Sequence, residues 1–183
     1  MIYRMNLPLT EQDARTLRTG DCVYLTGVLY TARDAAHKRM HEALAAGKDL
    51  PVDLRGQTIY YMGPSPARPG QVIGSAGPTT ASRMDRYAPE LLNRGLRCMI
   101  GKGRRSDAVK EAVVRNGGVY LAAIGGAGAL LSECITGARV VAYEDLGTEA
   151  IRYLEVKDFP AFVILDTVGG DLYRQVEQEG QKK

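Results

Sequence analysis

The sequence has few of the features that mark cross-linked, metal-binding or membrane-spanning proteins. Its three cysteines, Cys22, Cys98 and Cys134, are odd in number and have neither the spacing of a disulfide framework nor that of a CxxC metal site. We therefore predict that each is a small buried apolar residue. No apolar run approaches the roughly 18 to 20 residues that a membrane-spanning helix needs, so we expect no membrane partner.

Histidine is also scarce. His37 and His41 are one helical turn apart, as in a zinc pair, but the sequence shows no third ligand and no metalloprotease glutamate between them. We interpret both as surface or site-edge histidines. The first residues lack the apolar core and cleavage site of a secretory signal, which makes a cytoplasmic location the default expectation.

The excess of positive charge is small: 24 Lys and Arg stand against 21 Asp and Glu, a formal net charge of +3. The densest basic stretch, residues 102–105, lies in a glycine turn without interleaved aromatics, so we expect no nucleic-acid partner. A small anionic ligand suits this stretch better, although most such runs are solvated loops. The sequence also shows no nucleophile elbow, Walker lysine loop or obvious histidine general base.

What is present is an alternation of apolar-rich strands and helices. A chain of 183 residues can bury roughly 70% of its unfolded surface, enough for one core. Hydrophobic periodicity predicts strands over 22–30, 58–62, 72–75, 96–100, 119–124, 138–143, 151–156 and 161–166. It predicts helices over 31–46, from after Pro78 to about 93, over 106–117, and from the glycine turn 125–128 to about 134.

This order predicts an α/β fold with a mixed sheet. Strands that alternate with helices in the centre imply parallel βαβ units with right-handed crossovers, and the flanking β-rich sections imply added antiparallel strands. The sheet should therefore contain more strand than a Rossmann fold. We divide the chain into a lead-in arm (1–20), one domain (21–168) and a polar tail that frays at its end (169–183).

Four strand ends carry residues that could reach a ligand, which is where open α/β sheets bind. At the first, Arg33 enters a helix, where a cation is unfavourable unless an anion is near. The alternative is a solvated arginine paired with Asp34 or Glu42. At the second, small residues precede two threonines and Arg83, and the backbone there can approach an anion at a helix start. A helix cap needs only one threonine, so the second remains to be explained.

At the third strand end, Lys102 stands between two glycines and suits a carboxylate or phosphate as a point charge, although a turn lysine is usually just solvated. At the fourth, residues 123–131 do not give GxGxxG in register, and we interpret them as close backbone packing. Two arginines, a lysine and threonine hydroxyls can grip a dicarboxylate and handle one proton. Another group must polarise the substrate, so the chain looks like half of an active site.

The motifs that carry a family resemblance run in order from about residue 20 to 173. They are 27–37, 61–64, 77–80 with 83–85, 101–103, 125–126, 144–147 with 149–151, and 156–161. In these segments the sequence closely resembles the β subunit of two-subunit class I fumarases, which corresponds to the C-terminal domain of the single-chain enzymes. It is also related to the β subunit of L-tartrate dehydratase.

The resemblance implies a swivelling β/β/α domain that closes over a [4Fe–4S] cluster carried by an α subunit, in a heterodimer or heterotetramer. The three cysteine ligands of the cluster belong to the α subunit in this family, so this chain is expected to hold no metal ligand. The open iron acts there as a Lewis acid on the substrate. The reaction implied is the reversible hydration of fumarate to (S)-malate.

The resemblance also assigns substrate contacts. Arg33, Arg83 and Lys102 match the residues that hold the substrate carboxylates, and Thr80 is a weaker substrate-binding candidate. We count Arg83 and Lys102 as catalytic as well, because they would hold the substrate in line for addition across the double bond.

Thr79 matches the catalytic threonine of the family and would exchange the proton at carbon. A threonine hydroxyl has a pKa far above neutral, so nearby cations must lower that pKa strongly. Asp85 and His37 are possible orienting residues.

Two alternatives stay open. The chain could serve another hydro-lyase of this architecture, such as L-tartrate dehydratase or mesaconate hydratase, because the absent subunit supplies part of the pocket wall. It could also be a non-catalytic anion-binding or assembly module. Retention of a threonine beside the cations argues for the enzyme, since a site that only binds would not need it.

Overall fold

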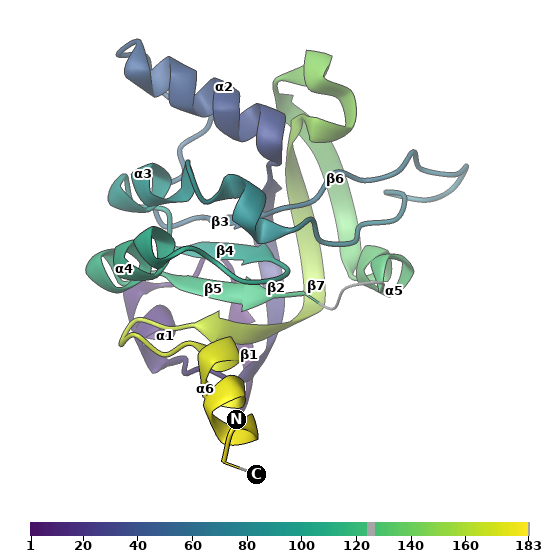
Figure 1. Cartoon of the computed structure of the whole chain (residues 1–183). Helices are drawn as coiled ribbons and strands as arrows, with labels where there is room; N and C mark the ends of the chain where they lie inside the picture. Colours follow the sequence, from purple (N-terminus) through teal and green to yellow (C-terminus); the bar gives the residue numbers. More distant parts are fainter. Residues whose placement is uncertain (124–126, 183) are drawn as a thin grey trace.

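The computed structural model describes residues 1–123 and 127–182, and Figure 1 shows a sheet with several helices gathered on one side. Within these residues the sheet has seven strands, β1 (Ile2–Asn6), β2 (Cys22–Thr31), β3 (Thr58–Tyr60), β4 (Cys98–Gly101), β5 (Val119–Ala122), β6 (Ile135–Ala142) and β7 (Ile151–Leu165). The α-helices are α1 (Glu11–Thr16), α2 (Asp34–Ala45), α3 (Ala88–Asn93), α4 (Asp107–Asn116), α5 (Gly128–Glu133) and α6 (Leu172–Gly180). Two short 3₁₀ helices are η1 (Ala81–Met84) and η2 (Glu144–Glu149).

Strands β1 to β5 are neighbours in chain order and pair in parallel. Strand β7 pairs antiparallel with β5, β6 and β2. The mixed α/β sheet predicted from the sequence is therefore confirmed. The pairing of β7 with both β2 and β5 also closes strands β2, β3, β4, β5 and β7 into a barrel-like ring, which the sequence did not predict. A closed ring leaves its strands without open edges.

Alternate residues of the parallel strands feed two apolar cores. Tyr60 and Ile100 belong to a cluster that contains side chains from every strand of the ring. Their neighbours Ile59 and Met99 belong to a second cluster shared with helices α2, α3 and α4. Successive side chains of a strand point to opposite faces, so each short strand serves both cores. Figure 1 shows these three helices on the same side of the sheet.

Several element boundaries differ from the prediction. The two strands predicted over 151–156 and 161–166 form one 15-residue strand, β7, which continues through Pro160. Residues 72–75 form no strand but part of the long connection between β3 and η1, and Val72 is exposed. The helix predicted from Pro78 to 93 is divided into η1 and α3. Pro89 has no N–H to continue a helix and is tolerated only in the first turn, where α3 places it.

Other boundaries shift by a few residues. The predicted helix 31–46 starts at Asp34, because β2 continues to Thr31 and Arg33 is still extended. The predicted strand 119–124 is described as far as Ala122. Ile124 and the glycine motif 125–126 lie outside the described residues.

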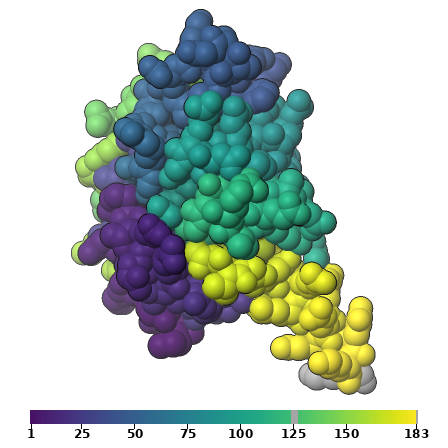
Figure 2. All heavy atoms as spheres, turned by 90° about the vertical axis from the view of Figure 1, so that its left-hand side faces the viewer, coloured from purple at the N-terminus to yellow at the C-terminus, as the bar shows by residue number. Residues whose placement is uncertain are grey.

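Both terminal segments contain more structure than the sequence predicted. Residues 1–20, predicted as a lead-in arm, hold strand β1 and helix α1. The helix begins with a capping box in which Thr10 and Asp13 bond to each other's backbone N–H groups. The polar tail forms helix α6, capped by Asp171, and Figures 1 and 2 show it standing out from the body of the molecule. The division into arm, domain and tail stays a prediction.

The cysteines follow the sequence prediction only in part. Cys98 is fully buried in β4, and burial raises the pKa of its thiol to about 12. Cys22 and Cys134 are half-buried, so the prediction of burial was wrong for these two. Among the described helices, none has the length and apolar character needed to cross a bilayer.

Candidate functional site

The residues singled out from the sequence lie at the carboxyl ends of three neighbouring parallel strands. Arg33 follows β2, and Lys102 follows β4 directly. Thr79 reaches the end of β3 from a distant part of the chain, because its backbone N–H donates to the carbonyl of Tyr61 at 2.7 Å. Parallel strands present their carboxyl ends at one edge of a sheet, and the site is therefore assembled at the edge where α/β folds bind ligands.

The second threonine, Thr80, is held beside the lysine by its backbone. Thr80 and Lys102 form an isolated parallel bridge, and the N–H of Ala81 donates to the Lys102 carbonyl at 2.8 Å. Gly101 allows this approach, because a Cβ there would lie 2.8 Å from Tyr61 and 3.0 Å from Ala81. Within the described chain, the Thr80 hydroxyl makes no capping hydrogen bond to η1, although Thr80 precedes that helix. Its hydroxyl is therefore not used as a helix cap.

Asp34 joins two of the candidate arginines. Its Oδ2 lies 2.7 Å from Nε of Arg83, and its Oδ1 lies 3.9 Å from Nε of Arg33. The pairing of Arg33 with Asp34, which the sequence left as an alternative, is therefore loose, and the close partner of Asp34 is Arg83. The carboxylate brings together the arginine that follows β2 and the arginine of η1.

His37, interpreted from the sequence as a surface or site-edge histidine, does not lie on the surface but is buried. Helix α2 turns it inward beside Ala36 and Met40, and its ring packs edge-on against Tyr61. Its Nδ1 lies 2.8 Å from the carbonyl of Arg33, which can only accept, so Nδ1 carries the proton. Burial lowers the pKa of His37 to about 4, and the ring is therefore neutral near pH 7. It holds the Arg33 backbone in place and has no proton to offer from Nε2.

His41, one turn later, is exposed as expected. Its Nδ1 lies 2.8 Å from the carboxylate of Glu90. The two histidines therefore have separate environments and do not act as a pair.

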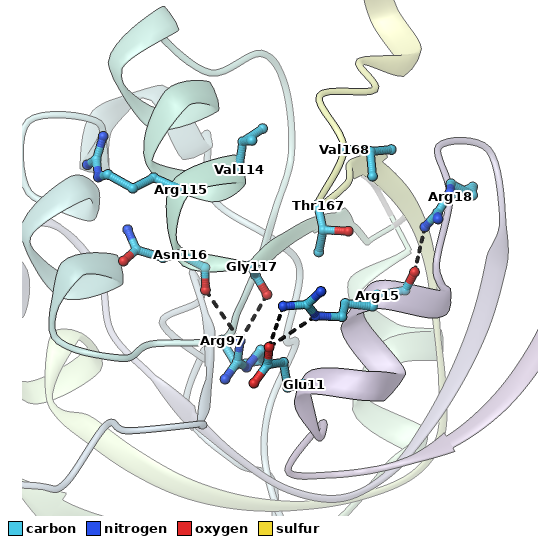
Figure 3. Close-up of a pocket in the computed structure, with 10 residues that line it drawn as sticks. All are labelled: Glu11, Arg15, Arg18, Arg97, Val114, Arg115, Asn116, Gly117, Thr167 and Val168. Atoms are coloured by element: carbon cyan, nitrogen blue, oxygen red, sulfur yellow. Dashed lines mark hydrogen bonds and ion pairs between the residues drawn. The ribbon is translucent and has the colours of Figure 1, made fainter.

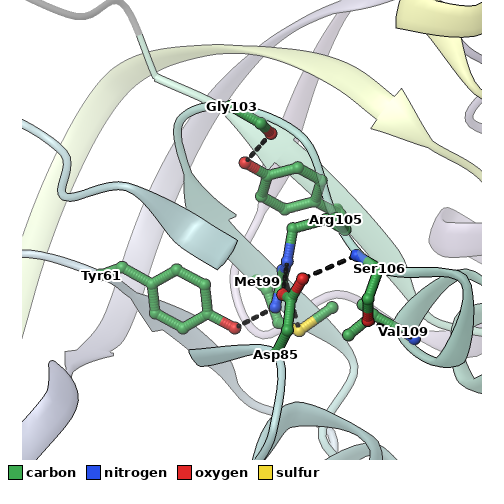
Figure 4. Close-up of polar contacts among 8 residues, drawn as sticks. Tyr61, Asp85, Met99, Gly103, Arg105, Ser106 and Val109 are labelled. Carbon is green, nitrogen blue, oxygen red and sulfur yellow. Dashed lines mark hydrogen bonds and ion pairs between the residues drawn. The ribbon is translucent and has the colours of Figure 1, made fainter. Parts of the chain in front are cut away.

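A buried arginine that the sequence did not single out, Arg105, supports the site from within the fold. Arg105 Nε donates to Asp85 at 2.6 Å, and its Nη2 donates to the hydroxyl of Tyr61 at 3.1 Å (Figure 4). The other Asp85 oxygen accepts the N–H of Ser106 at 2.6 Å. Asp85 therefore ties the end of η1 to the start of α4.

The same arginine lies between two aromatic rings. Its guanidinium carbon is 5.2 Å from the ring centre of Tyr61 and 4.7 Å from that of Tyr120. The Tyr120 hydroxyl donates to the carbonyl of Gly103 at 2.9 Å. These contacts fix the loop that presents Lys102, and Asp85 supports that loop through Arg105 and Ser106.

The basic stretch 102–105 does not act as one surface. Arg105 is internal, and Arg104 is bound to Glu177 of helix α6 at 2.5 Å. Lys102 is exposed, and among the described residues its ammonium takes part in no ion pair. Of the three cations in this stretch, only Lys102 is therefore available to an anionic ligand.

A second cluster of arginines lies at the other edge of the sheet. Arg15, Arg18, Arg97 and Arg115 line a surface hollow of about 560 Å³ beside the amino ends of β4 and β5 (Figure 3). Each of these arginines has a partner within the chain. Arg15 pairs with Glu11, and Arg115 donates to the side chain of Asn93. Arg97 donates to a carbonyl at the end of α4, and Arg18 donates to the carbonyls of Arg15 and Leu17. The hollow contains none of the candidate site residues.

The described residues contain no group of three or more His, Cys, Asp and Glu side chains arranged to hold a metal ion. The cysteines illustrate this, since Cys98 lies within the core in β4 while Cys22 opens β2 and Cys134 follows α5. These residues do not fit an iron–sulfur cluster.

Comparison with known proteins gives consistent matches. Residues 2–176 match the family model described as "Fumarase C-terminus". The chain is 44% identical over 154 residues to the anaerobic class I fumarate hydratase of Escherichia coli, covering 83% of this chain and 28% of that protein. It is 42% identical over 180 residues to mitochondrial fumarate hydratase 1 of Leishmania major, covering 96% of this chain and 33% of that protein.

A third relative has nearly the same length as this chain. The putative L(+)-tartrate dehydratase subunit beta of Methanocaldococcus jannaschii is 36% identical over 189 residues, covering 100% of this chain and 96% of that protein. The chain thus spans about a third or less of the fumarate hydratases above, and nearly all of a protein named as a subunit.

Proposed function

We propose, because this chain belongs to the fumarase C-terminus family, that it supplies the carboxylate-binding and proton-transfer half of a hydro-lyase site. The reaction would be the reversible hydration of fumarate to (S)-malate. The observation that carries the proposal is the meeting of Arg33, Thr79, Arg83 and Lys102 at one edge of the sheet. The class I fumarate hydratases among its relatives support the choice of reaction.

The cations would hold the two carboxylates of the substrate. Arg33 and Arg83 share Asp34 and are thus close enough to act on one carboxylate, which the planar guanidinium group binds through two parallel hydrogen bonds. Lys102 follows the neighbouring strand and would bind the other carboxylate as a compact charge. Held at both ends, the double bond of fumarate is fixed in orientation for addition.

Thr79 would exchange the proton at carbon. Its backbone is fixed by the hydrogen bond to Tyr61, and it lies next to Thr80, whose backbone pairs with Lys102. Nearby positive charge stabilises an alkoxide and so favours proton removal from the hydroxyl. Thr80 is exposed beside Lys102 and remains a substrate-binding candidate.

His37 and Asp85 would act as positioning residues. His37 does so through the carbonyl of Arg33, and Asp85 through Arg105 and the loop that carries Lys102. Neither needs to touch the substrate for this role.

The other half of the site would come from a partner α subunit with a [4Fe–4S] cluster. Such a cluster supplies a Lewis-acid iron when bound. The partner is supported by the relative named as a beta subunit, which this chain matches over almost its whole length. A heterodimer or heterotetramer, closed by movement of this domain over the cluster, is the corresponding assembly.

A second candidate is the β subunit of an L-tartrate dehydratase. The observation that favours it is the same relative, since it covers this chain completely whereas the fumarate hydratases are much longer. Tartrate is also a dicarboxylate, so the cationic residues would serve both substrates. Mesaconate hydration and a purely anion-binding role are further outcomes that the same experiment distinguishes.

The test is to tag this chain in its native host and purify it without oxygen, together with whatever partner it retains. We expect iron, a second band, and hydration of fumarate, with L-tartrate and mesaconate assayed in parallel. Arg83→Ala and Lys102→Ala should abolish turnover while the complex still assembles. Arg86→Ala is the matched control, because Arg86 is exposed and stacks on Tyr87 outside the site.

Two results would contradict the proposal. One is near wild-type turnover by either variant. The other is a folded chain that copurifies with no partner and no iron and shows no activity, which would favour the anion-binding module.

A further inference from the structure

We propose that Asp34 lowers the positive charge of the substrate site by one, which favours dianions over trianions, and holds Arg83 in position within it. This inference rests on the proposed function and adds a residue that determines specificity. Its basis is the placement of one carboxylate between the two candidate arginines.

The contacts of Asp34 are unequal. Oδ2 forms a close ion pair with Arg83, whereas Oδ1 and the Nε of Arg33 are 3.9 Å apart. Both of these last two atoms are buried and have no hydrogen-bond partner among the described residues. Buried polar atoms are nearly always hydrogen-bonded. A donor and an acceptor that are too far apart to bond directly are commonly bridged by a third polar atom. An ordered water or a ligand oxygen would complete the arrangement.

Among the described residues, Asp34 makes no capping hydrogen bond at the start of α2. An acidic residue at the start of a helix commonly accepts backbone N–H groups or offsets the helix dipole. At the start of α2, however, the N–H of Ala35 donates to Glu149 at 3.1 Å. Arg33 makes no side-chain cap there, and Oδ1 of Asp34 accepts no bond from the described chain. Glu149 therefore caps this helix, which leaves Asp34 to the arginines.

Asp34 reduces the positive charge that this chain contributes to the site. Arg33, Arg83 and Lys102 contribute three positive charges, and Asp34 removes one, which leaves two from this chain. Arg105 and Asp85 neutralise each other, and Glu149 faces the positive end of α2. Without Asp34 the site would gain one positive charge, which would shift its preference from a dianion toward a trianion. Charge matching of this kind selects among ligands that otherwise resemble one another.

Asp34 also limits the freedom of an exposed side chain. Arg83 is 54% exposed, and its ion pair with Asp34 is the contact that directs it toward Arg33. A long side chain fixed before the ligand arrives loses less conformational entropy on binding. Asp34 thus acts as a positioning residue through Arg83.

The experiment uses the assembled complex with the Asp34→Asn variant. Inhibition constants are measured for succinate, a dianion, and for propane-1,2,3-tricarboxylate at mildly alkaline pH, where every carboxyl group is ionised. The ratio of the two constants should move by about tenfold in favour of the tricarboxylate in Asp34→Asn. The ratio is the chosen readout because loss of Arg83 orientation weakens both inhibitors.

Two further variants separate charge from structure. Glu149→Gln also removes one carboxylate at the start of α2. Within the described part of the chain Glu149 forms no ion pair with either arginine, so the ratio should stay within about twofold of wild type. Asp34→Glu keeps the charge and lengthens the side chain, so it should raise KM and leave the ratio unchanged. A ratio that is unchanged in Asp34→Asn, or one that moves as far in Glu149→Gln, overturns the inference. Wild-type complex that neither binds nor turns over dicarboxylates would instead overturn the proposed function, and this inference with it.

Discussion

Arg105 and Asp85 form an ion pair beneath the candidate site, with 2.6 Å between Nε and Oδ1 and none of the Arg105 side chain exposed to solvent. The pair connects η1, which carries Arg83, to the loop that carries Lys102. The enclosed charge of Arg105 depends on Asp85 as its counter-charge, because the guanidinium group cannot reach water without opening the fold.

Removal of one member of this pair should therefore destabilise the chain strongly. We expect Asp85→Asn to lower the free energy of unfolding by about 3 to 5 kcal/mol, since it leaves Arg105 buried without a counter-charge. Urea denaturation of the full chain measures the change. Arg104→Ala is the matched control: its side chain is 58% exposed and paired with Glu177, and its loss should cost no more than about 1 kcal/mol. Equal effects from the two variants would show that Arg105 is solvated.

The buried His37 should make stability depend on acid. Its pKa falls from 6.5 in the unfolded chain to about 4 in the folded protein because of burial. The contribution of His37 to the free energy of unfolding is therefore fully present above about pH 6.5. It is lost as the pH falls from 6.5 toward 4, because over this range the unfolded chain binds the proton and the folded protein does not. The loss amounts to about 3 kcal/mol over this range.

Chemical denaturation at several pH values tests this expectation. His37→Gln should be less stable at neutral pH, but its free energy of unfolding should not show the decrease between pH 6.5 and 4 that His37 causes. His41→Gln keeps the slope, because His41 is exposed and its ring is not enclosed by the core. A wild-type slope in the His37 variant would assign the acid sensitivity to another group.

Substitutions of the two threonines should have different effects on kcat and KM in the assembled enzyme. Thr79→Val removes the proposed proton-transfer hydroxyl at constant shape, so kcat should fall roughly 10² to 10⁴-fold with little change in KM. Thr79→Ser should restore much of the rate. Thr80→Val should mainly raise KM, because Thr80 is proposed to contact the substrate. The reverse division between kcat and KM would exchange the two roles.

Gly63 should be intolerant of a side chain because of its position beside Arg33. A Cβ at this residue would lie 2.7 Å from the carbonyl of Thr148 and 3.0 Å from Cδ of Arg33. Gly63→Ala should therefore displace Arg33 and lower kcat/KM roughly tenfold to a hundredfold. Gly180→Ala serves as the control, since a Cβ there meets nothing within 4 Å. Unchanged kinetics in Gly63→Ala would show that Arg33 is not held at this place for catalysis.

Local patterns in the sequence determined much of the fold. The apolar runs of β2, β4 and β5 and the cap at Ser106 are short-range features, and they placed these elements within a few residues. The positions of Lys102 and Arg33 at strand ends followed from the same patterns, because the end of a strand is itself a local property. The family was visible from motifs that keep their order along the chain.

The tertiary structure alone decided the partners of the charged and buried groups. Closure of the sheet depends on β7 pairing at once with β2 and β5, and no local pattern specifies two distant neighbours. The burial of His37 and Arg105, and the choice of Arg83 as the close partner of Asp34, likewise arise between segments that are far apart in sequence. The sequence by itself determined which groups are available at the strand ends. Only the packed fold determined which charges neutralise each other and which remain for a ligand, because burial and electrostatic pairing depend on distances between atoms from different segments.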